Sequence, residues 1–264
     1  MLQFFQDSSQ FIVSGALVGL LVGMTGVGGG SLMTPLLTII FGVAPTTAVG
    51  TDLAFAAITK GFGTVAHRLH GNVRWDIVKL LCLGSITTAI LSILALKFIG
   101  PVSKSFNHFI SFSIGVSVLL TAISLLFRAK ILKWVQDNPS LLPSGSNLKI
   151  ATVAVGAVIG ILVTVSSIGA GAIGATLILI LYPHLKPSQV AGTDIAYAVP
   201  LTALAGIGHW WLGNVHFDLL LGLLLGSVPA IWLGAKLSSS LSEKATRNTL
   251  AVTLFLVGIK LVAS

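Results

Sequence analysis

Charged residues and cysteine are both scarce in this sequence. Asp, Glu, Lys and Arg make up only 8% of the 264 residues, whereas hydrophobic residues make up 55%. Soluble globular domains carry about 25% charged residues, so this composition excludes an ordinary soluble domain. The single cysteine, Cys82, excludes an internal disulfide framework. Because Cys82 lies inside an apolar run, we interpret it as a buried core residue.

Acidic residues are scarcer than basic ones. The sequence has seven Asp and Glu residues and 15 Lys and Arg residues, which gives a net charge of +8. A basic balance can indicate nucleic-acid binding, but these cations form no stripe interleaved with aromatic residues. They fall between the apolar runs, as the positive-inside rule describes for membrane proteins. We therefore expect a lipid bilayer around the chain and no nucleic-acid partner.

Glycines interrupt the first apolar stretch. The runs at residues 11–24 and 32–41 are each shorter than the roughly 20 residues that a helix needs to cross a bilayer. We therefore predict a re-entrant helical hairpin whose glycine-rich tip lies near the middle of the membrane. Irregular backbone at that depth must be buried in protein or line a watery cavity. The glycines spaced by four residues before the tip are predicted to allow close helix packing; they are Gly15, Gly19 and Gly23.

The second half of the chain repeats the first. An offset of 141 residues superimposes the glycines of the first hairpin, Gly15, Gly19, Gly28 and Gly30, on Gly156, Gly160, Gly169 and Gly171. From the second hairpin onward the offset is 142, and it superimposes Gly50-Thr51-Asp52 on Gly192-Thr193-Asp194. The segments Gly71-Asn72-Val73 and Gly213-Asn214-Val215 match in the same way. Identities at a fixed offset indicate an internal duplication.

Three long apolar segments follow the first hairpin, at about residues 45–69, 77–98 and 106–127, and the second half has the same order. We predict a first transmembrane repeat at residues 1–127, a cytoplasmic linker at residues 128–149 and a second repeat at residues 150–264. The fold class is an all-α polytopic membrane protein, in which each repeat is a broken hairpin followed by three transmembrane helices.

The distribution of Lys and Arg predicts that the two repeats are inverted. Residues 68–79 carry three such cations and the linker carries four, whereas residues 210–218, which are equivalent to the first of these loops, carry none. The basic segments are expected to be cytoplasmic and both termini external. Inverted repeats whose broken helices meet at the midplane are an architecture of secondary transporters.

The interrupted glycine-rich hairpin, from Gly15 through Gly28-Gly29-Gly30 to Pro35, and the duplicated Gly-Thr-Asp segment resemble the TauE/SafE sulfite exporter family. The resemblance covers nearly the whole chain. It implies a multi-pass transporter of the cell inner (plasma) membrane that exports sulfite or small organosulfonates; other members are tied to thiosulfate and related sulfur compounds. The second hairpin departs from the pattern, because Ala170 replaces Gly29 and Thr176 replaces Pro35.

The two tips are predicted to bind a small anion. Three consecutive glycines at 28–30 end a helix and leave backbone N–H groups beside the start of the next one, which suits an anion. A nucleotide-binding loop is disfavoured because no Lys follows and no strand precedes. Neither tip contains a cation, so we expect a weakly held, releasable anion. The candidate substrate-binding residues are Thr25, Gly28, Gly29, Gly30, Ser31, Thr51, Ser166, Ser167, Gly169, Gly171 and Thr193.

Asp52 and Asp194 are the ionisable residues at equivalent depth in the two halves. Asp52 lies seven residues after Pro45, about 10 Å into its helix. An ionisable group at that depth is a functional candidate, either as a coupling site for a proton or cation or as a brace for the hairpin. Lys60 has Thr202 as its counterpart, so it is an asymmetric charge that either reaches the membrane surface or pairs with Asp52.

Two alternatives use the same central cavity: a polytopic membrane enzyme and an anion channel. An enzyme would need Ser31, Ser166 or Ser167 as a nucleophile with His209 as its base, but no motif places them in register. His67 and His70 share a helix face without an accompanying Cys or carboxylate cluster, so we expect no metal site, and no cofactor is expected. The duplicated break favours a transporter over an enzyme, because alternating access needs two matching gates. A homodimer is compatible with this pattern.

Overall fold

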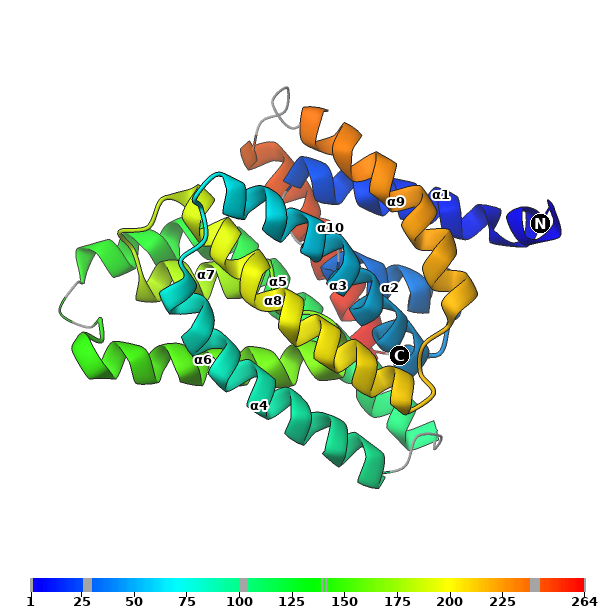
Figure 1. Cartoon of the computed structure of the whole chain (residues 1–264), viewed down its shortest axis with the longest axis horizontal. Helices are drawn as coiled ribbons and strands as arrows, with labels where there is room; N and C mark the ends of the chain where they lie inside the picture. The colour runs from blue at the N-terminus through cyan, green and yellow to red at the C-terminus, as the bar shows by residue number, and fades with distance from the viewer. Residues whose placement is uncertain are drawn as a thin grey trace.

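The chain folds into helices, as the hydropathy pattern predicts. The computed structural model describes residues 2–25, 30–99, 104–138, 140, 142–237 and 243–263, and these contain ten α-helices and no strand (Figure 1). The helices of the first half are α1 (Leu2–Thr25), α2 (Gly30–Ile39), α3 (Pro45–Leu69), α4 (Trp75–Ile99) and α5 (Lys104–Asp137). Those of the second half are α6 (Gly145–Ser166), α7 (Ala172–Leu181), α8 (Pro187–Trp211), α9 (Phe217–Leu237) and α10 (Glu243–Ala263).

The two halves have the same order of helix lengths. A long helix is followed by a ten-residue helix, α2 or α7, and then by a 25-residue helix, α3 or α8, that begins with proline. Pro is favoured in the first turn because its missing N–H would have no partner there. Within the described residues, α4, α5, α6, α8 and α9 are long and apolar enough to cross a membrane. The prediction of an all-α polytopic membrane protein is confirmed.

The third apolar segment of the first half forms a longer helix than predicted. We expected a span at residues 106–127 and a linker from residue 128, but α5 continues to Asp137. The added residues include good helix formers and no glycine or proline before Pro139. The basic segment that contains Arg128, Lys130 and Lys133 is therefore helical.

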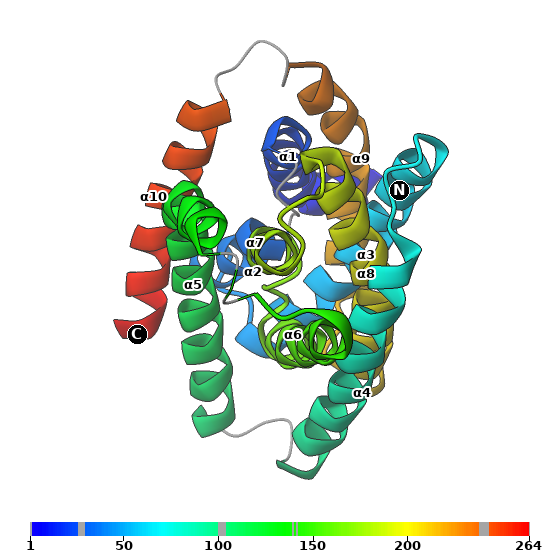
Figure 2. The same cartoon turned by 90° about the vertical axis from the view of Figure 1, so that its left-hand side faces the viewer.

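The long helices pair across the two halves. α1 packs along α9, α6 along α4, α3 along α8 and α5 along α10, so each pair takes one helix from each half. Figure 2 shows the short helices α2 and α7 in the centre of the ring that these pairs form. Met33 and Leu37 of α2 and Ile178 of α7 are accordingly buried. Each half thus buries its apolar faces against the other half.

Glycines allow the closest helix pairs. A Cβ atom on Gly15 or Gly19 of α1 would overlap the backbone of Leu223 or Ser227 in α9. The equivalent glycines of α6, Gly156 and Gly160, meet the backbone of Leu81 and Ser85 in α4 in the same way. The packing interpretation is therefore confirmed for Gly15 and Gly19; the surroundings of Gly23 lie outside the described residues. Gly84 in α4 and Gly226 in α9 are packing glycines that the sequence pattern did not reveal.

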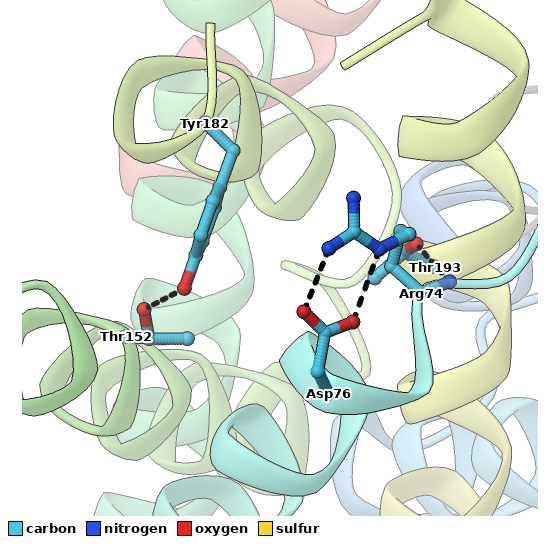
Figure 3. Close-up of polar contacts among 5 residues, drawn as sticks. All are labelled: Arg74, Asp76, Thr152, Tyr182 and Thr193. Carbon is cyan, nitrogen blue, oxygen red and sulfur yellow. Dashed lines mark hydrogen bonds and ion pairs between the residues drawn. The ribbon is translucent and has the colours of Figure 1, made fainter. Parts of the chain in front are cut away.

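The duplicated Gly-Thr pair of each half contacts the loop that follows the 25-residue helix of the other half. Gly192 of α8 faces the Asn72 carbonyl, and the Thr193 Oγ1 atom accepts a hydrogen bond of 3.1 Å from the Arg74 N–H (Figure 3).

The first-half counterparts make the same contacts: Gly50 of α3 faces the Asn214 carbonyl, and Thr51 Oγ1 accepts a hydrogen bond of 3.1 Å from the His216 N–H. The end of each 25-residue helix therefore lies near the start of the other, and α3 and α8 run antiparallel.

The α3–α4 loop, the end of α5 and the start of α6, which carry the basic segments predicted to be cytoplasmic, lie at the same end of the bundle (Figure 1). Arg74 forms an ion pair of 2.8 Å with Asp76 there, and the hydrogen bond between them raises the pKa of Arg74. In the same view, Tyr182 and Thr152 are joined by a hydrogen bond of 2.7 Å that ties the end of α7 to α6 (Figure 3). At the opposite end, Pro45 and Lys260 line one cavity. Both chain ends lie toward the right of Figure 1, whereas the end of α5 and the start of α6 lie at the left.

This arrangement leads to a first prediction, on membrane topology. In a Cys82→Ala background, Ser144→Cys is expected to react with a membrane-impermeant thiol reagent only from the cytoplasm and Ser9→Cys only from outside, because the basic end should face the cytoplasm. Both serines are exposed in the structure. Labelling of intact cells and of inverted vesicles measures the difference. Reaction of both positions from the same side would contradict the predicted orientation.

Candidate functional site

The second tip (residues 166–171) is an irregular turn inside the bundle. α6 ends at Ser166, Ser167 takes a left-handed conformation with φ 60°, and Gly169 and Gly171 have φ 139° and 128° before α7 begins. Such angles are accessible to glycine and uncommon for other residues. Ser166, Ser167 and Ile168 are each no more than 5% exposed. The predicted break in the helix is confirmed here, and it is buried in protein.

Hydrogen bonds hold part of the second tip rigid and leave one hydroxyl unused. Ser166 Oγ donates to the Leu162 carbonyl at 2.6 Å and accepts the Ile168 N–H at 3.2 Å. The Gly174 N–H donates to the Gly169 carbonyl at 2.9 Å, which starts α7. Ser167 Oγ is buried without a hydrogen-bond partner in the described structure. A buried polar atom without a partner calls for an explanation such as a bound ion or water.

Asp52 of α3 connects the first half of the chain to the second tip. Its carboxylate is fully buried, and one oxygen accepts a hydrogen bond from the Thr34 hydroxyl of α2. Among the described residues, no well-formed hydrogen bond reaches the other oxygen, Oδ1. The Ser167 side chain lies close enough to interact with this carboxylate. A carboxylate of one half and an unpaired hydroxyl of the other therefore share one buried space.

Asp194 of α8 reaches the same tip from the opposite side. It is 3% exposed, and the backbone N–H of Gly171 interacts with its carboxylate. Asp194 Oδ1 and the Tyr197 hydroxyl are buried and have no well-formed hydrogen bond among the described residues, but they lie close enough to interact with each other, and both face Gly174. A Cβ atom at Gly174 would overlap both of them. The absence of a side chain at Gly174 thus lets these two polar groups of α8 pack directly against the backbone of α7.

Lys60 of α3 places a cation between the two carboxylates. It is 8% exposed, its Nζ atom donates a hydrogen bond of 3.2 Å to the Ala170 carbonyl of the second tip, and it interacts electrostatically with Asp52 and Asp194. Residues 166–171 contain no Lys or Arg, so the cation at the second tip comes from α3, a contact that the sequence did not predict. Because the Lys60 side chain is buried and bonded to the second tip, it does not extend to the surface of the protein. It also forms no direct ion pair with Asp52, because the one ion pair within 4.0 Å among the described residues joins Arg74 to Asp76.

Most of the predicted residues of the first tip (residues 25–31) lie outside the part of the chain that the structure describes. Gly28 and Gly29 lie outside the described residues, and for Thr25 and Gly30 only the helical backbone is described. Ser31 is buried in the first turn of α2.

Of the other predicted residues, the structure brings Asp52, Asp194, Lys60, Ser167 and Gly171 together. Thr51 and Thr193 instead direct their hydroxyl oxygens to the loops that dock on α3 and α8.

Thr34, Gly174 and Tyr197 are site residues that the sequence reasoning missed. Thr34 lies three residues after Ser31, and Tyr197 lies three residues after Asp194, so each shares a helix face with a predicted residue. This spacing was the signal that could have revealed them. No local sequence pattern distinguishes Gly174, because its role depends on two side chains of α8, Asp194 and Tyr197, that pack against it.

His209 is not hydrogen-bonded to Ser166 or Ser167, two of the serines proposed as its partners in an enzyme. His209 is buried, and its Nε2 atom donates to the Thr164 carbonyl at 2.9 Å. Ser166 bonds to the Leu162 carbonyl, and Ser167 Oγ has no partner in the described structure. His209 therefore holds the end of α6 and is not hydrogen-bonded to either serine.

Two threonines of α2 lie between Asp52 and a cavity at one end of the bundle. Thr34 and Thr38 follow each other by one helical turn on α2, and Thr38 lines a cavity of about 310 Å³ together with Ser111 and Lys260. At the offset of 141 residues that aligns the two hairpins, the α7 counterparts of Thr34 and Thr38 are Ala175 and Leu179. Thr176 donates to the Ala172 carbonyl and accepts a hydrogen bond from Ser124, so the two short helices differ in their polar contacts.

Comparison with known proteins gives matches along the whole chain. Residues 11–261 match the family described as Sulfite exporter TauE/SafE. The chain is 37% identical to the probable membrane transporter protein YjnA of Bacillus subtilis, covering 97% of this chain and 100% of that protein. It is 28% identical to YdhB, another probable membrane transporter protein of Bacillus subtilis, covering 93% and 96% of the two chains. A probable membrane transporter protein of Haemophilus influenzae is 26% identical over 95% of this chain. No solved structure matches the chain.

Proposed function

Because this chain belongs to the TauE/SafE family of sulfite exporters, we propose that it is a secondary transporter that exports small sulfur-containing anions across the inner membrane. Sulfite and organosulfonates are the proposed substrates, and alternating access around the two hairpin tips is the proposed mechanism. The observation that carries this proposal is the convergence of Asp52 and Asp194, equivalent residues of the two halves, on one buried tip.

The helix directions support oppositely oriented halves. α3 and α8 run antiparallel, so equivalent helices point to opposite sides of the membrane. α1 packs parallel to α9, since Gly15 meets Leu223 and Gly19 meets Ser227. α6 packs in the same way on α4, which is the equivalent of α9. These relations are those expected of an inverted repeat, in which each hairpin could close the site toward a different side.

The chemistry of the second tip suits an oxyanion that must be released again. The Ser167 hydroxyl, the N-terminus of α7 and the Lys60 ammonium group offer donors and positive charge. Asp52 and Asp194 oppose this attraction with two carboxylates. A transporter benefits from such a balance, because an ion that binds too tightly cannot leave. The hydroxyls of Thr34 and Thr38 and the cavity at Lys260 are the proposed route of release.

The membrane potential can drive this export without a coupled ion. With the cell interior negative, moving one negative charge outward is favourable by about 2.3 kcal/mol per 100 mV. A gradient of the anion adds to this term when sulfite or a sulfonate accumulates inside. The proposed direction therefore follows from the charge of the substrate.

A second prediction concerns the substrate. Liposomes that contain the purified protein are expected to transport radiolabelled sulfite and a small sulfonate, and to ignore a neutral amine of similar size. Unlabelled anion on the far side should accelerate the exchange of labelled anion, because a carrier returns faster when loaded. A preference for the amine would contradict the proposed substrate class, and anion flux without this acceleration would favour the channel alternative.

A further inference from the structure

Lys60 joins α3 of the first half to the tip of the second hairpin. The Nζ atom bonds to the Ala170 carbonyl at 3.2 Å, across 110 residues of sequence. Ala170 lies between Gly169 and Gly171, whose positive φ angles make the turn. This hydrogen bond therefore holds the point at which the hairpin reverses direction.

The two halves differ at this position. The counterpart of Lys60 is Thr202, whose hydroxyl donates to the Ala198 carbonyl in its own helix. Thr202 therefore carries no cation toward the first hairpin. Of the described Lys and Arg side chains, Lys60 is the one that is buried. Any control of a hairpin by this buried cation is therefore limited to the second hairpin.

The ammonium group of Lys60 is bonded to a neutral acceptor although two carboxylates lie near. Asp52 and Asp194 both attract Lys60, but neither is within 4.0 Å of it. A lysine has three N–H donors, so it can exchange one partner for another without leaving its place. An anionic oxygen adds a Coulombic attraction to the ammonium group that a neutral carbonyl oxygen lacks. An oxyanion that enters the tip is therefore a better partner for Lys60 than the Ala170 carbonyl.

We propose that Lys60 is an anion-responsive latch on the second hairpin. Without substrate it holds the tip through the Ala170 carbonyl; when the anion binds, the ammonium group turns to the anion and the tip is released. Lys60 thereby gives the site its preference for anions and couples binding to the movement of one hairpin. This inference rests on the proposed function, because it assumes that the transported substrate is an anion.

The latch can be tested with a thiol at the tip. In a Cys82→Ala background, Ala170→Cys keeps the carbonyl that accepts the hydrogen bond and adds a reactive group. Its rate of reaction with a maleimide is measured on the full chain in liposomes, with and without methanesulfonate. A sulfonate is used because sulfite itself reacts with maleimides. Methanesulfonate is expected to increase the rate by about tenfold, the change that corresponds to loss of one charge-assisted hydrogen bond.

Substitutions at Lys60 separate a latch from a passive brace. Lys60→Met should make the thiol react fast with or without methanesulfonate. Lys60→Gln keeps a donor for the Ala170 carbonyl but lacks charge, so the thiol should react slowly and without response to the anion. Lys97→Met removes a cation that lies 3.8 Å from the ring centroid of Trp211, away from the tip, and serves as the control that should behave like the parent.

Two outcomes would overturn the latch. One is a response to methanesulfonate that persists in a folded Lys60→Met or Lys60→Gln variant. The other is an unresponsive thiol in a parent protein that transports sulfonate in the same liposomes, which would refute the latch and leave the proposed function intact. If that parent protein transports no anion, the proposed function itself fails.

Discussion

Gly174→Val is expected to abolish anion flux while the protein still inserts and folds. The valine side chain would occupy the space where Asp194 Oδ1 and the Tyr197 hydroxyl face Gly174. Both polar groups are buried, so the substitution displaces them from the second tip, where we propose that the anion binds. Flux of labelled sulfite into liposomes measures the loss. Gly174→Ala should reduce flux less, because one methyl group displaces Asp194 and Tyr197 by a smaller distance.

Two other glycines provide matched controls for this substitution. Gly61 lies in a helix with no atom within 4 Å of an added Cβ, so Gly61→Ala should leave flux unchanged and slightly raise stability. Gly19→Ala forces a methyl group into the backbone of Ser227 and should lower the free energy of unfolding by about 1–3 kcal/mol, the usual cost of overpacking. Normal flux in Gly174→Val would remove this part of the site from the mechanism.

The order of helices could be predicted from sequence because its signals are local. Glycine-rich and proline-containing segments between the apolar runs indicate where helices begin and end, although Pro35, Pro200 and Pro229 lie inside helices. The duplication doubled the evidence for each break. The end of α5 was misplaced for a related reason. The uninterrupted apolar run stops near Phe127, but the helix continues until Asp137. Residues 128–137 mix charged and apolar residues and contain no glycine or proline, so they also favour a helix.

The composition of the site was only partly predictable. Asp52 and Asp194 could be recognised because a carboxylate at membrane depth is unusual. The bond from Lys60 to Ala170 could not, because it joins residues 110 positions apart and depends on how α3 meets α6 and α7. Thr51 and Thr193 were selected as substrate ligands because they lie beside the two aspartates. Only the packing of the opposite loops reveals that their hydroxyls accept the N–H groups of His216 and Arg74.

Asp52→Asn and Asp194→Asn are expected to abolish the pH dependence of transport. In the parent protein, flux of a sulfonate should rise as the pH falls, because protonation of either carboxylate reduces the repulsion of the anion. Lys60 faces both carboxylates; Thr34 and Ser167 face Asp52, and Tyr197, Arg128 and the Gly171 N–H face Asp194. A sulfonate stays an anion over the whole range, so any pH dependence of its flux belongs to the protein. Asparagine cannot titrate, and the flux of each variant should lose the part that its carboxylate contributes.

The same variants also test the alternative that the aspartates only brace the hairpins. In that case each substitution should lower the free energy of unfolding by about 1–3 kcal/mol, as expected for a disturbed buried hydrogen bond, and the pH profile should keep its shape. Thermal unfolding in detergent and the pH profile of flux in liposomes are measured on the same preparations. Thr34→Val serves as a control, because it removes the hydroxyl that donates to Asp52 without changing any charge. A double variant with the stability and the pH profile of the parent would contradict both interpretations, and the two carboxylates would then have no part in transport or in folding.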